Sequence, residues 1–147
     1  MVIQQGMSIG ELAQKTGLSP RTLRYYEECG LVAPAARSGG GRRLYAPDVL
    51  DRLRRIRELQ DLLGFSLEEI RQVIAAEERV RELRARYHRE EDAASRRQVL
   101  EEAIALAEAL LALVDRRRAG LEAMRADLGE RLARYRRLLR ELEERGE

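Results

Sequence analysis

Two hydrophobic patterns divide the chain. Up to about residue 76, apolar side chains recur at helical spacing in short stretches separated by glycine, proline and serine. Beyond that point there is no proline, and apolar side chains follow a seven-residue rhythm. These patterns predict a helical domain of residues 8–76, a helical connector of residues 77–93 and a coiled coil of residues 94–145. Residues 1–7 are expected to form a flexible arm.

Helix-start signals define the first two helices. Ser8 and Glu11 have the spacing of a capping box, and Gly17 suits the left-handed conformation that ends a helix. Ser19 can cap a second helix that has Pro20 at its first position, where the missing N–H has no cost. Two short helices joined by a tight glycine-containing turn predict a helix-turn-helix.

A wing and two more helices complete the predicted domain. The loop "RSGGGRRLY" is typical of a short β-hairpin with arginines beside a flexible tip. A third helix opens at Pro47, and a second capping box, Ser66 with Glu69, opens a fourth. The apolar positions of the third helix are Val49, Leu53, Ile56, Leu59 and Leu63. The predicted fold class is mainly α: a winged helix-turn-helix with a small β wing, followed by a long dimerising coiled-coil helix.

One apolar seam runs along residues 94–145. Its members are Leu100, Ala103, Ala107, Leu110, Val114, Leu121, Met124, Leu128, Tyr135, Leu138 and Leu142. A single helix here would be about 75 Å long at ~1.5 Å per residue, too long to bury its seam against the first domain. We therefore expect a second copy of the chain to cover the seam, with the members from Leu100 to Leu121 in the dimer contact. A hairpin near Gly120 is the alternative, since a glycine within a helix costs only ~1 kcal/mol.

Charge, cysteine content and hydropathy narrow the class of protein. The 28 basic and 26 acidic residues are unevenly placed: residues 1–76 carry 11 and 9, and residues 77–147 carry 17 of each. A partner attracted by positive charge should therefore meet the first half. Cys29, the single cysteine, excludes an internal disulfide and a multi-cysteine metal site. The start lacks the pattern of a signal peptide, and the apolar run 103–114 is shorter than the ~20 residues of a membrane span. We expect a soluble, cytoplasmic protein.

The second predicted helix carries the strongest candidate for a binding surface. Arg21, Arg24 and Tyr25 share one side of it, and Leu23 and Tyr26 lie on the other. Guanidinium groups bind guanine O6 and N7 or grip phosphate, and a tyrosine hydroxyl can donate to phosphate. Arginines near the start of the second helix of a helix-turn-helix lie where base edges are read. The pattern predicts a surface for double-stranded DNA.

The segment from residue 8 to residue 74 resembles the N-terminal domain of the MerR family of bacterial transcriptional regulators. The motifs "TLRYYEECGL", "GRRLY" and "LGFSLEEI" carry the resemblance jointly. It implies a homodimer, joined by an antiparallel coiled coil, that bends and untwists promoter DNA so that RNA polymerase can engage it. Mapped by position, the resemblance implies groove contacts from Arg21, Arg24 and Tyr25 and phosphate contacts from Arg37, Arg42, Arg43 and Tyr45. Thr22 and Arg55 complete the predicted DNA-contact set.

Departures from the family pattern limit the prediction. No cysteine follows Cys29, whereas metal- and redox-sensing relatives have cysteines at the end of the dimer helix, so we predict no metal ligands of that kind. His88 has no second ligand nearby and is expected to be a solvated helix residue. We find no nucleophile–base pair or phosphate-cradling motif, and predict no enzyme and no cofactor.

Two questions stay open in the sequence. The alternative function is a coiled-coil architectural or adaptor protein without promoter-specific control. A small-molecule effector is unidentified; a site for it would have to use residues 78–120, between Tyr87 and the broad apolar face of Leu106–Leu113. The sequence does not distinguish an activator from a repressor.

Overall fold

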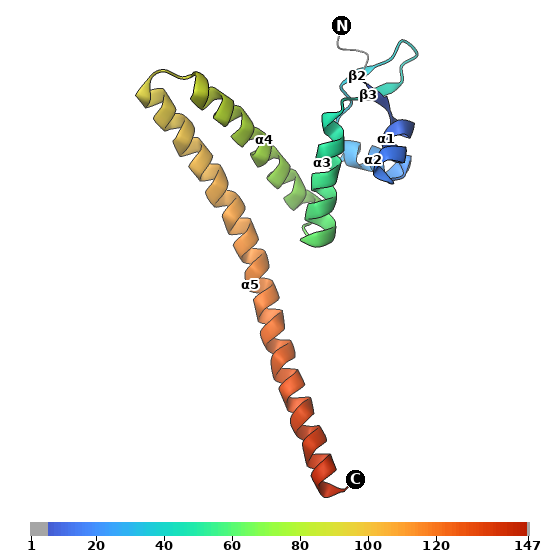
Figure 1. Cartoon of the computed structure of the whole chain (residues 1–147), viewed down its shortest axis with the longest axis vertical. Coiled ribbons are helices and arrows are strands. Elements are labelled where there is room, and N and C mark those ends of the chain that lie inside the picture. Colours follow the sequence, from blue (N-terminus) through green and yellow to red (C-terminus); the bar gives the residue numbers. More distant parts are fainter. Residues whose placement is uncertain (1–5, 147) are drawn as a thin grey trace. The chain divides into compact units, whose positions relative to one another are not determined.

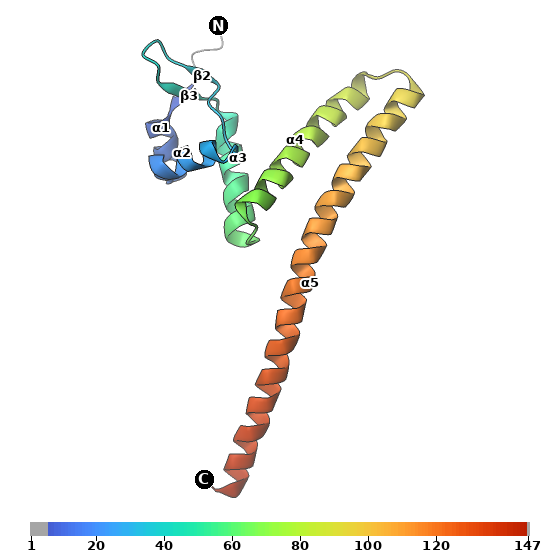
Figure 2. The same ribbon diagram turned by 180° about the vertical axis from the view of Figure 1, so that it is seen from behind.

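The computed structural model describes residues 6–146, shown from two sides in Figures 1 and 2. They form two compact units with a boundary between Arg79 and Val80. In chain order the elements are β1 (Met7–Ser8), α1 (Ile9–Thr16), α2 (Pro20–Glu28), β2 (Ala36–Arg37), β3 (Arg43–Tyr45), α3 (Asp48–Arg57), the π-helical turn η2 (Glu58–Leu62), α4 (Leu67–Arg89) and α5 (Ala93–Arg145). The predicted fold class, mainly α with a small β wing and a long C-terminal helix, is confirmed.

The predicted caps form the helix-turn-helix. The backbone N–H of Ser8 donates to Glu11 Oε2 at 2.9 Å, and the N–H of Glu11 donates to Ser8 Oγ at 3.2 Å. Gly17 ends α1 in the left-handed conformation, with φ of 71°. Ser19 Oγ then accepts from the N–H of Thr22 at 3.1 Å at the start of α2. Local side chains thus fix where both helices begin.

The wing is a three-stranded antiparallel sheet in the order β1-β3-β2. The predicted hairpin is confirmed: β2 pairs with β3, and Gly41 at the tip has φ of 77°. The strand β1, which pairs Met7 with Tyr45, was not predicted. Of the arm expected over residues 1–7, residues 1–5 lie outside the described part of the chain. For Met7 the expectation is wrong, because its backbone joins the sheet and its side chain is buried.

The first unit is held by an apolar core and by polar contacts that cross between its elements. The core consists of Met7, Leu12, Leu23, Tyr26, Leu31, Val32, Tyr45, Val49, Leu53, Ile56, Leu59, Phe65, Ile70, Val73 and Ile74. Arg57 donates to the carbonyl of Thr16 at 2.9 Å, joining α3 to the end of α1. The hydroxyl of Tyr26 donates to Gln60 Oε1 at 3.0 Å, joining α2 to η2. These contacts hold α1 against α3 and hold α2 against the π-helical turn that follows α3.

The third helix ends differently from its predicted pattern. Val49, Leu53, Ile56 and Leu59 are buried as expected, but Leu63 is 49% exposed. Its N–H bonds to the carbonyl of Glu58, five residues earlier, at 3.3 Å. A π turn holds an extra residue, so the side chains after it leave the apolar stripe.

Within the second unit, the end of α4 and the start of α5 form a hairpin around residues 90–92 (Figure 2). The second capping box is confirmed, with Ser66 and Glu69 each accepting from the other's N–H at 3.2 Å. Leu83 lies as many residues before the loop as Val99 lies after it. Both are buried, with exposed fractions of 1% and 2%.

Helix α5 is continuous through Gly120 from Ala93 to Arg145, so the alternative of a hairpin at Gly120 is wrong. At ~1.5 Å per residue it is about 80 Å long. Within the described residues, no helix combines the length and apolar character that a membrane crossing requires.

Candidate nucleic-acid interface

Helix α2 has one buried side and one exposed side, as predicted. Leu23 is 1% exposed and Tyr26 is 5% exposed, whereas Arg21 and Arg24 are fully on the surface. Thr22 is half-buried, with its hydroxyl oxygen 2.9 Å from Ser19 Oγ. The arginines are therefore free to reach outward, and Thr22 is part of the helix cap.

Tyr25 extends the exposed side of α2. Its ring is 49% exposed and lies 6.5 Å from the ring of Tyr26. A hydrogen bond with the Cys29 side chain raises the pKa of the Tyr25 hydroxyl. The phenol therefore stays protonated at neutral pH and can donate to a phosphate oxygen.

The wing carries three arginines that differ in exposure and in the contacts that hold their side chains. Arg37 and Arg42 are exposed, and Arg37 donates to the carbonyl of Gly41 at 3.4 Å across the hairpin. Arg43 is more constrained, with its Nε 3.4 Å from Glu27 Oε1 and its side chain 39% exposed. The arginines near the wing tip are thus exposed, whereas Arg43 at the base of the wing forms an ion pair with α2.

Tyr45 anchors that base and is not available to DNA. Its side chain is 0% exposed, and its hydroxyl donates to Glu27 Oε2 at 2.8 Å. Burial, together with the bond to Glu27, raises the pKa of Tyr45. The prediction that Tyr45 holds phosphate is wrong, because its ring has no surface left to offer. Glu27, which we did not predict, instead joins α2 to the wing through both Tyr45 and Arg43.

A shallow depression lies where the wing, α2 and the start of α1 come together. It is lined by Ser8, Ile9, Gly10, Arg24, Arg42 and Arg43 and has a volume of about 440 Å³. Three arginine side chains thus line the depression together with the N-terminal turn of α1, the positive end of its dipole. This combination suits a phosphate group. Ile9 and Gly10 were missed in the sequence because their position depends on the β1–β3 pairing.

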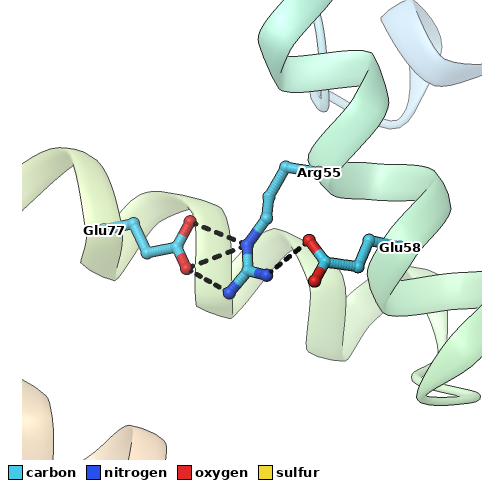
Figure 3. Close-up of polar contacts among 3 residues, drawn as sticks. All are labelled: Arg55, Glu58 and Glu77. Atoms are coloured by element: carbon cyan, nitrogen blue, oxygen red, sulfur yellow. Dashed lines mark hydrogen bonds and ion pairs between the residues drawn. The ribbon is translucent and has the colours of Figure 1, made fainter.

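Arg55 lies in a polar network inside the first unit (Figure 3). Its Nη2 and Nε donate to Glu77 Oε1 at 2.7 and 3.1 Å, and its Nη1 donates to Glu58 at 2.8 Å. These hydrogen bonds, chiefly that with Glu77, raise the pKa of Arg55. Arg52 makes a parallel ion pair with Glu78. The prediction that Arg55 contacts DNA conflicts with this geometry, since its guanidinium already joins α3 to α4.

The predicted dimer seam lies along α5. Leu100, Val114 and Leu121 are 47%, 49% and 60% exposed; Ala107 is exposed, and Ala103 and Leu110 are half-buried. The buried residues of α5 are instead Val99 and Leu113. The seam is thus available for another chain, while a second line of the same helix is covered within the protein.

The region suggested for an effector is partly occupied by neighbouring side chains. The guanidinium of Arg96 lies 5.6 Å from the ring centroid of Tyr87, and the ring of His88 meets Tyr87 edge-on at 5.9 Å. Leu106 is half-buried. The effector site stays a prediction.

Comparison with known proteins places this architecture in a family. Residues 7–77 match the family model described as MerR HTH family regulatory protein. The N-terminal segment of residues 7–77 is thus a helix-turn-helix domain of the MerR type. Relatives that share part of this sequence are described as HTH-type transcriptional regulators.

Similar proteins match this chain over different lengths. The HTH-type transcriptional regulator YfmP of Bacillus subtilis is 42% identical over 64 residues, 44% of this chain and 46% of that protein. The HTH-type transcriptional regulator HmrR of Sinorhizobium medicae is 42% identical over 69 residues, 47% of this chain and 46% of that protein. The chain thus spans less than half the length of these two relatives. A solved structure, the transcription regulator PbrR691 from Ralstonia metallidurans CH34 in complex with lead(II), is 34% identical with a TM-score of 0.47 and covers 84% of each chain.

Proposed function

We propose that this protein is a transcriptional regulator of the MerR type that binds a two-fold symmetric promoter site as a homodimer and distorts the DNA between its half-sites. It acts in the cytoplasm and affects RNA polymerase indirectly, through the shape of the promoter. The observation that carries this proposal is the convergence of Arg24, Arg42 and Arg43 on the first turn of α1. Three cations around a helix N-terminus are arranged for a backbone phosphate at the edge of a groove.

In this proposal α2 enters the major groove. Arg21, Arg24 and Tyr25 project from its exposed side, while Leu23 and Tyr26 hold the helix on the core. Arg21 and Arg24 read base edges, and the protonated hydroxyl of Tyr25 donates to phosphate. Arg37, Arg42 and Arg43 hold phosphates beside the groove. Their contacts release counterions, so affinity should fall steeply with salt.

The second unit supports the dimer. A soluble chain rarely leaves a long row of large apolar side chains half-exposed unless another surface covers it. Burying the exposed half of one leucine is worth about 1 kcal/mol. The row on α5 includes Leu100, Ile104, Leu111, Val114, Leu121, Met124, Leu128, Leu132, Tyr135, Leu138, Leu139 and Leu142. Its length is sufficient for a stable association of two copies.

A chemical footprint tests the proposal. Hydroxyl-radical and permanganate probing of the DNA upstream of the gene should reveal two protected half-sites and a hyper-reactive centre. Arg24→Ala should weaken protection. The matched control is Arg97→Ala, which removes the same charge from an exposed position of α5.

The other outcomes separate the remaining functions. Diffuse protection without a reactive centre would favour an architectural DNA-binding protein. No protection, on this fragment or on a random-sequence pool, would favour an adaptor. Equal effects of Arg24→Ala and Arg97→Ala would remove the depression from the DNA contact.

A further inference from the structure

Glu27 is an acidic side chain beside a surface that is otherwise lined by arginines. The depression proposed for a phosphate is lined by Arg24, Arg42 and Arg43. Glu27, on α2, pairs with the last of these, its Oε1 lying 3.4 Å from Arg43 Nε. A carboxylate this close to a phosphate repels it through space and lowers the affinity for any DNA. The contacts of Glu27 indicate what it contributes against this cost.

The carboxylate of Glu27 is held on two sides. Its Oε2 accepts a hydrogen bond from the hydroxyl of Tyr45 at 2.8 Å, while its Oε1 faces Arg43. Tyr45 is a fixed donor, because its side chain is buried and its backbone pairs with Met7 in the sheet. The Glu27 side chain is itself only 19% exposed. The carboxylate therefore has a set position with respect to both α2 and β3.

Strand geometry brings both partners of Glu27 to one side of the sheet. Arg43 and Tyr45 are two residues apart on β3, and alternate residues of a strand project to the same side. Burial and the bond to Glu27 raise the pKa of Tyr45, whereas the charges of Arg43 and Arg24 act in the opposite direction. Both guanidinium groups thus lie near the pair of Tyr45 and Glu27.

We infer that Glu27 is a positioning residue of the DNA interface: anchored by Tyr45, it sets where Arg43 presents its guanidinium relative to α2. The inference rests on the proposed function, since it requires a phosphate at the depression. It adds a residue that acts on DNA affinity through another side chain and not through a contact of its own.

The pair with Glu27 leaves Arg43 able to hold a phosphate. A guanidinium has N–H donors on Nε and on both terminal nitrogens, in one planar fork. Glu27 lies at Nε, so the donors of the terminal nitrogens can serve a phosphate in the depression that Arg43 lines. Because the fork already has a set direction, less side-chain freedom is lost when the phosphate binds.

Arg42 provides an internal comparison. It precedes Arg43 in the wing and lines the same depression, but its side chain is exposed, whereas that of Arg43 is paired with Glu27. Arg42 must therefore be ordered when it meets a phosphate, while Arg43 is ordered beforehand. A change at Glu27 should act through Arg43 and leave the contribution of Arg42 unchanged.

The direction of a charge effect tests this inference. Glu27→Gln removes the ion pair with Arg43 but keeps a carbonyl oxygen that can accept from Tyr45. The matched control is Glu28→Gln, which removes the same charge from the next position of α2, where the side chain is exposed. Loss of an acidic group from a DNA-binding surface should by itself tighten binding, so Glu28→Gln should lower the dissociation constant. Glu27→Gln should instead raise it, by about five-fold.

Double-mutant cycles identify the residue through which Glu27 acts. In an Arg43→Ala background the weakening should disappear, and Glu27→Gln should tighten binding as Glu28→Gln does. In an Arg42→Ala background the weakening should persist. Fluorescence anisotropy at fixed salt measures the dissociation constants for the DNA upstream of the gene and for a random-sequence duplex of equal length. Both DNAs should give the same pattern, since Arg43 holds phosphate and reads no bases.

A second variant leaves the net charge unchanged. Tyr45→Phe keeps the carboxylate of Glu27 and removes the hydrogen bond that anchors it, so DNA binding should again weaken. Thermal unfolding checks that each variant is folded. If Glu27→Gln does not fold, Tyr45→Phe in the wild-type and Arg43→Ala backgrounds replaces it, and its weakening of binding should be absent in the second.

The remaining outcomes separate this inference from the proposed function. Equal tightening by Glu27→Gln and Glu28→Gln would make Glu27 an ordinary surface charge and overturn the inference. A weakening that persists in the Arg43→Ala background would mean that Glu27 acts through the fold of the wing, which also overturns it. In both cases the wild type still binds its site, so the proposed function stands. A wild type that binds neither DNA would overturn the proposed function and this inference together.

Discussion

The two units of this protein complete their structures in different ways. The first unit buries its apolar residues within one chain, under helices whose starts are fixed by local caps such as Ser8 and Ser19. The second unit buries Leu83, Val99 and Leu113 and leaves a long apolar row on α5 exposed. On the proposed function, the first unit completes its apolar core within one chain, whereas the second unit completes its core against another copy. Stability should therefore depend on concentration in the second unit only.

The largest effect should come from a charge in the exposed row. Leu121→Glu should dissociate the dimer, because two carboxylates would be desolvated near the centre of the seam without partners. We expect the dimer dissociation constant to rise at least about 1,000-fold, roughly 4 kcal/mol. The affinity for the full promoter site should fall as the dimer dissociates, since the helix-turn-helix domain of a single chain binds only one half-site.

Light scattering and DNA titration check this prediction. The control is Ala126→Glu, an exposed position five residues away on the outer side of the same helix. A dimer that survives Leu121→Glu with unchanged mass would contradict the view that the second unit is incomplete alone.

A truncation in the core of the first unit should have the next largest effect. Leu53 is 0% exposed, and Leu53→Ala should destabilise the first unit by about 2–5 kcal/mol through lost burial and a cavity. The loss should not vary with protein concentration. Thermal unfolding at several concentrations measures it, with Leu128→Ala as the comparison, whose effect should shrink as the concentration rises. A concentration-dependent loss in Leu53→Ala would mean that the two units are not separable in this way.

The DNA-facing side of α2 should show an intermediate effect. Arg24→Ala should cost about 1–3 kcal/mol of affinity for the specific site and relax the preference at one or two base pairs. Arg43→Ala should weaken all sequences alike, because it holds the phosphate backbone. Titrations against the specific site and random DNA at two salt concentrations separate these roles. Equal losses on both DNAs for Arg24→Ala would remove it from base readout.

The network of Figure 3 should have a smaller effect, confined to the first unit. Arg55→Gln breaks the contacts with Glu58 and Glu77 but leaves α2 and the wing intact. Because Arg55 and Glu77 are each more than a third exposed, we expect a loss of only about 1 kcal/mol in stability. The salt dependence of DNA binding should not change. A salt slope reduced by about one would instead make Arg55 a phosphate contact.

The sequence predicted what depends on neighbours along the chain and missed what depends on distant segments. Both capping boxes, the wing and the exposed side of α2 follow from residues within a few positions of each other. The strand at Met7 and the π turn after Arg57 do not, since they need β3 or the core to form. The same reason explains why Tyr45 and Arg55 were predicted to contact DNA. Their residue types suit DNA, but each side chain donates a hydrogen bond to a glutamate distant in the sequence: Tyr45 to Glu27, 18 positions away, and Arg55 to Glu77, 22 positions away.

The sequence of α5 posed a different problem. The seven-residue repeat identified the seam, but a glycine at position 120 could not by itself decide between a helix and a hairpin. Val99 was missed because it lies one residue before Leu100, outside the seven-residue repeat. Its burial depends on the hairpin with α4, whose loop at residues 90–92 contains no glycine or proline that would mark it.

The smallest predicted effect concerns the local cap of the second unit. Asp92 starts α5 by accepting from the N–H of Ser95 at 2.9 Å, and this bond lowers the pKa of Asp92 below its ordinary value of 3.8. A depressed folded pKa stabilises the folded state fully above the unfolded pKa, and the contribution is lost as pH falls through the folded value. Asp92→Asn keeps an acceptor without the charge, so wild type should be slightly more stable at pH 7, and the difference should shrink as the pH falls through the ordinary value of 3.8 and below it. Thermal unfolding of both proteins from pH 7 down to pH 2.5 measures the difference, with Asp115→Asn, in the middle of α5, as the control for general charge effects. A gap that stays constant over this range would mean that the charge of Asp92 contributes nothing to the cap.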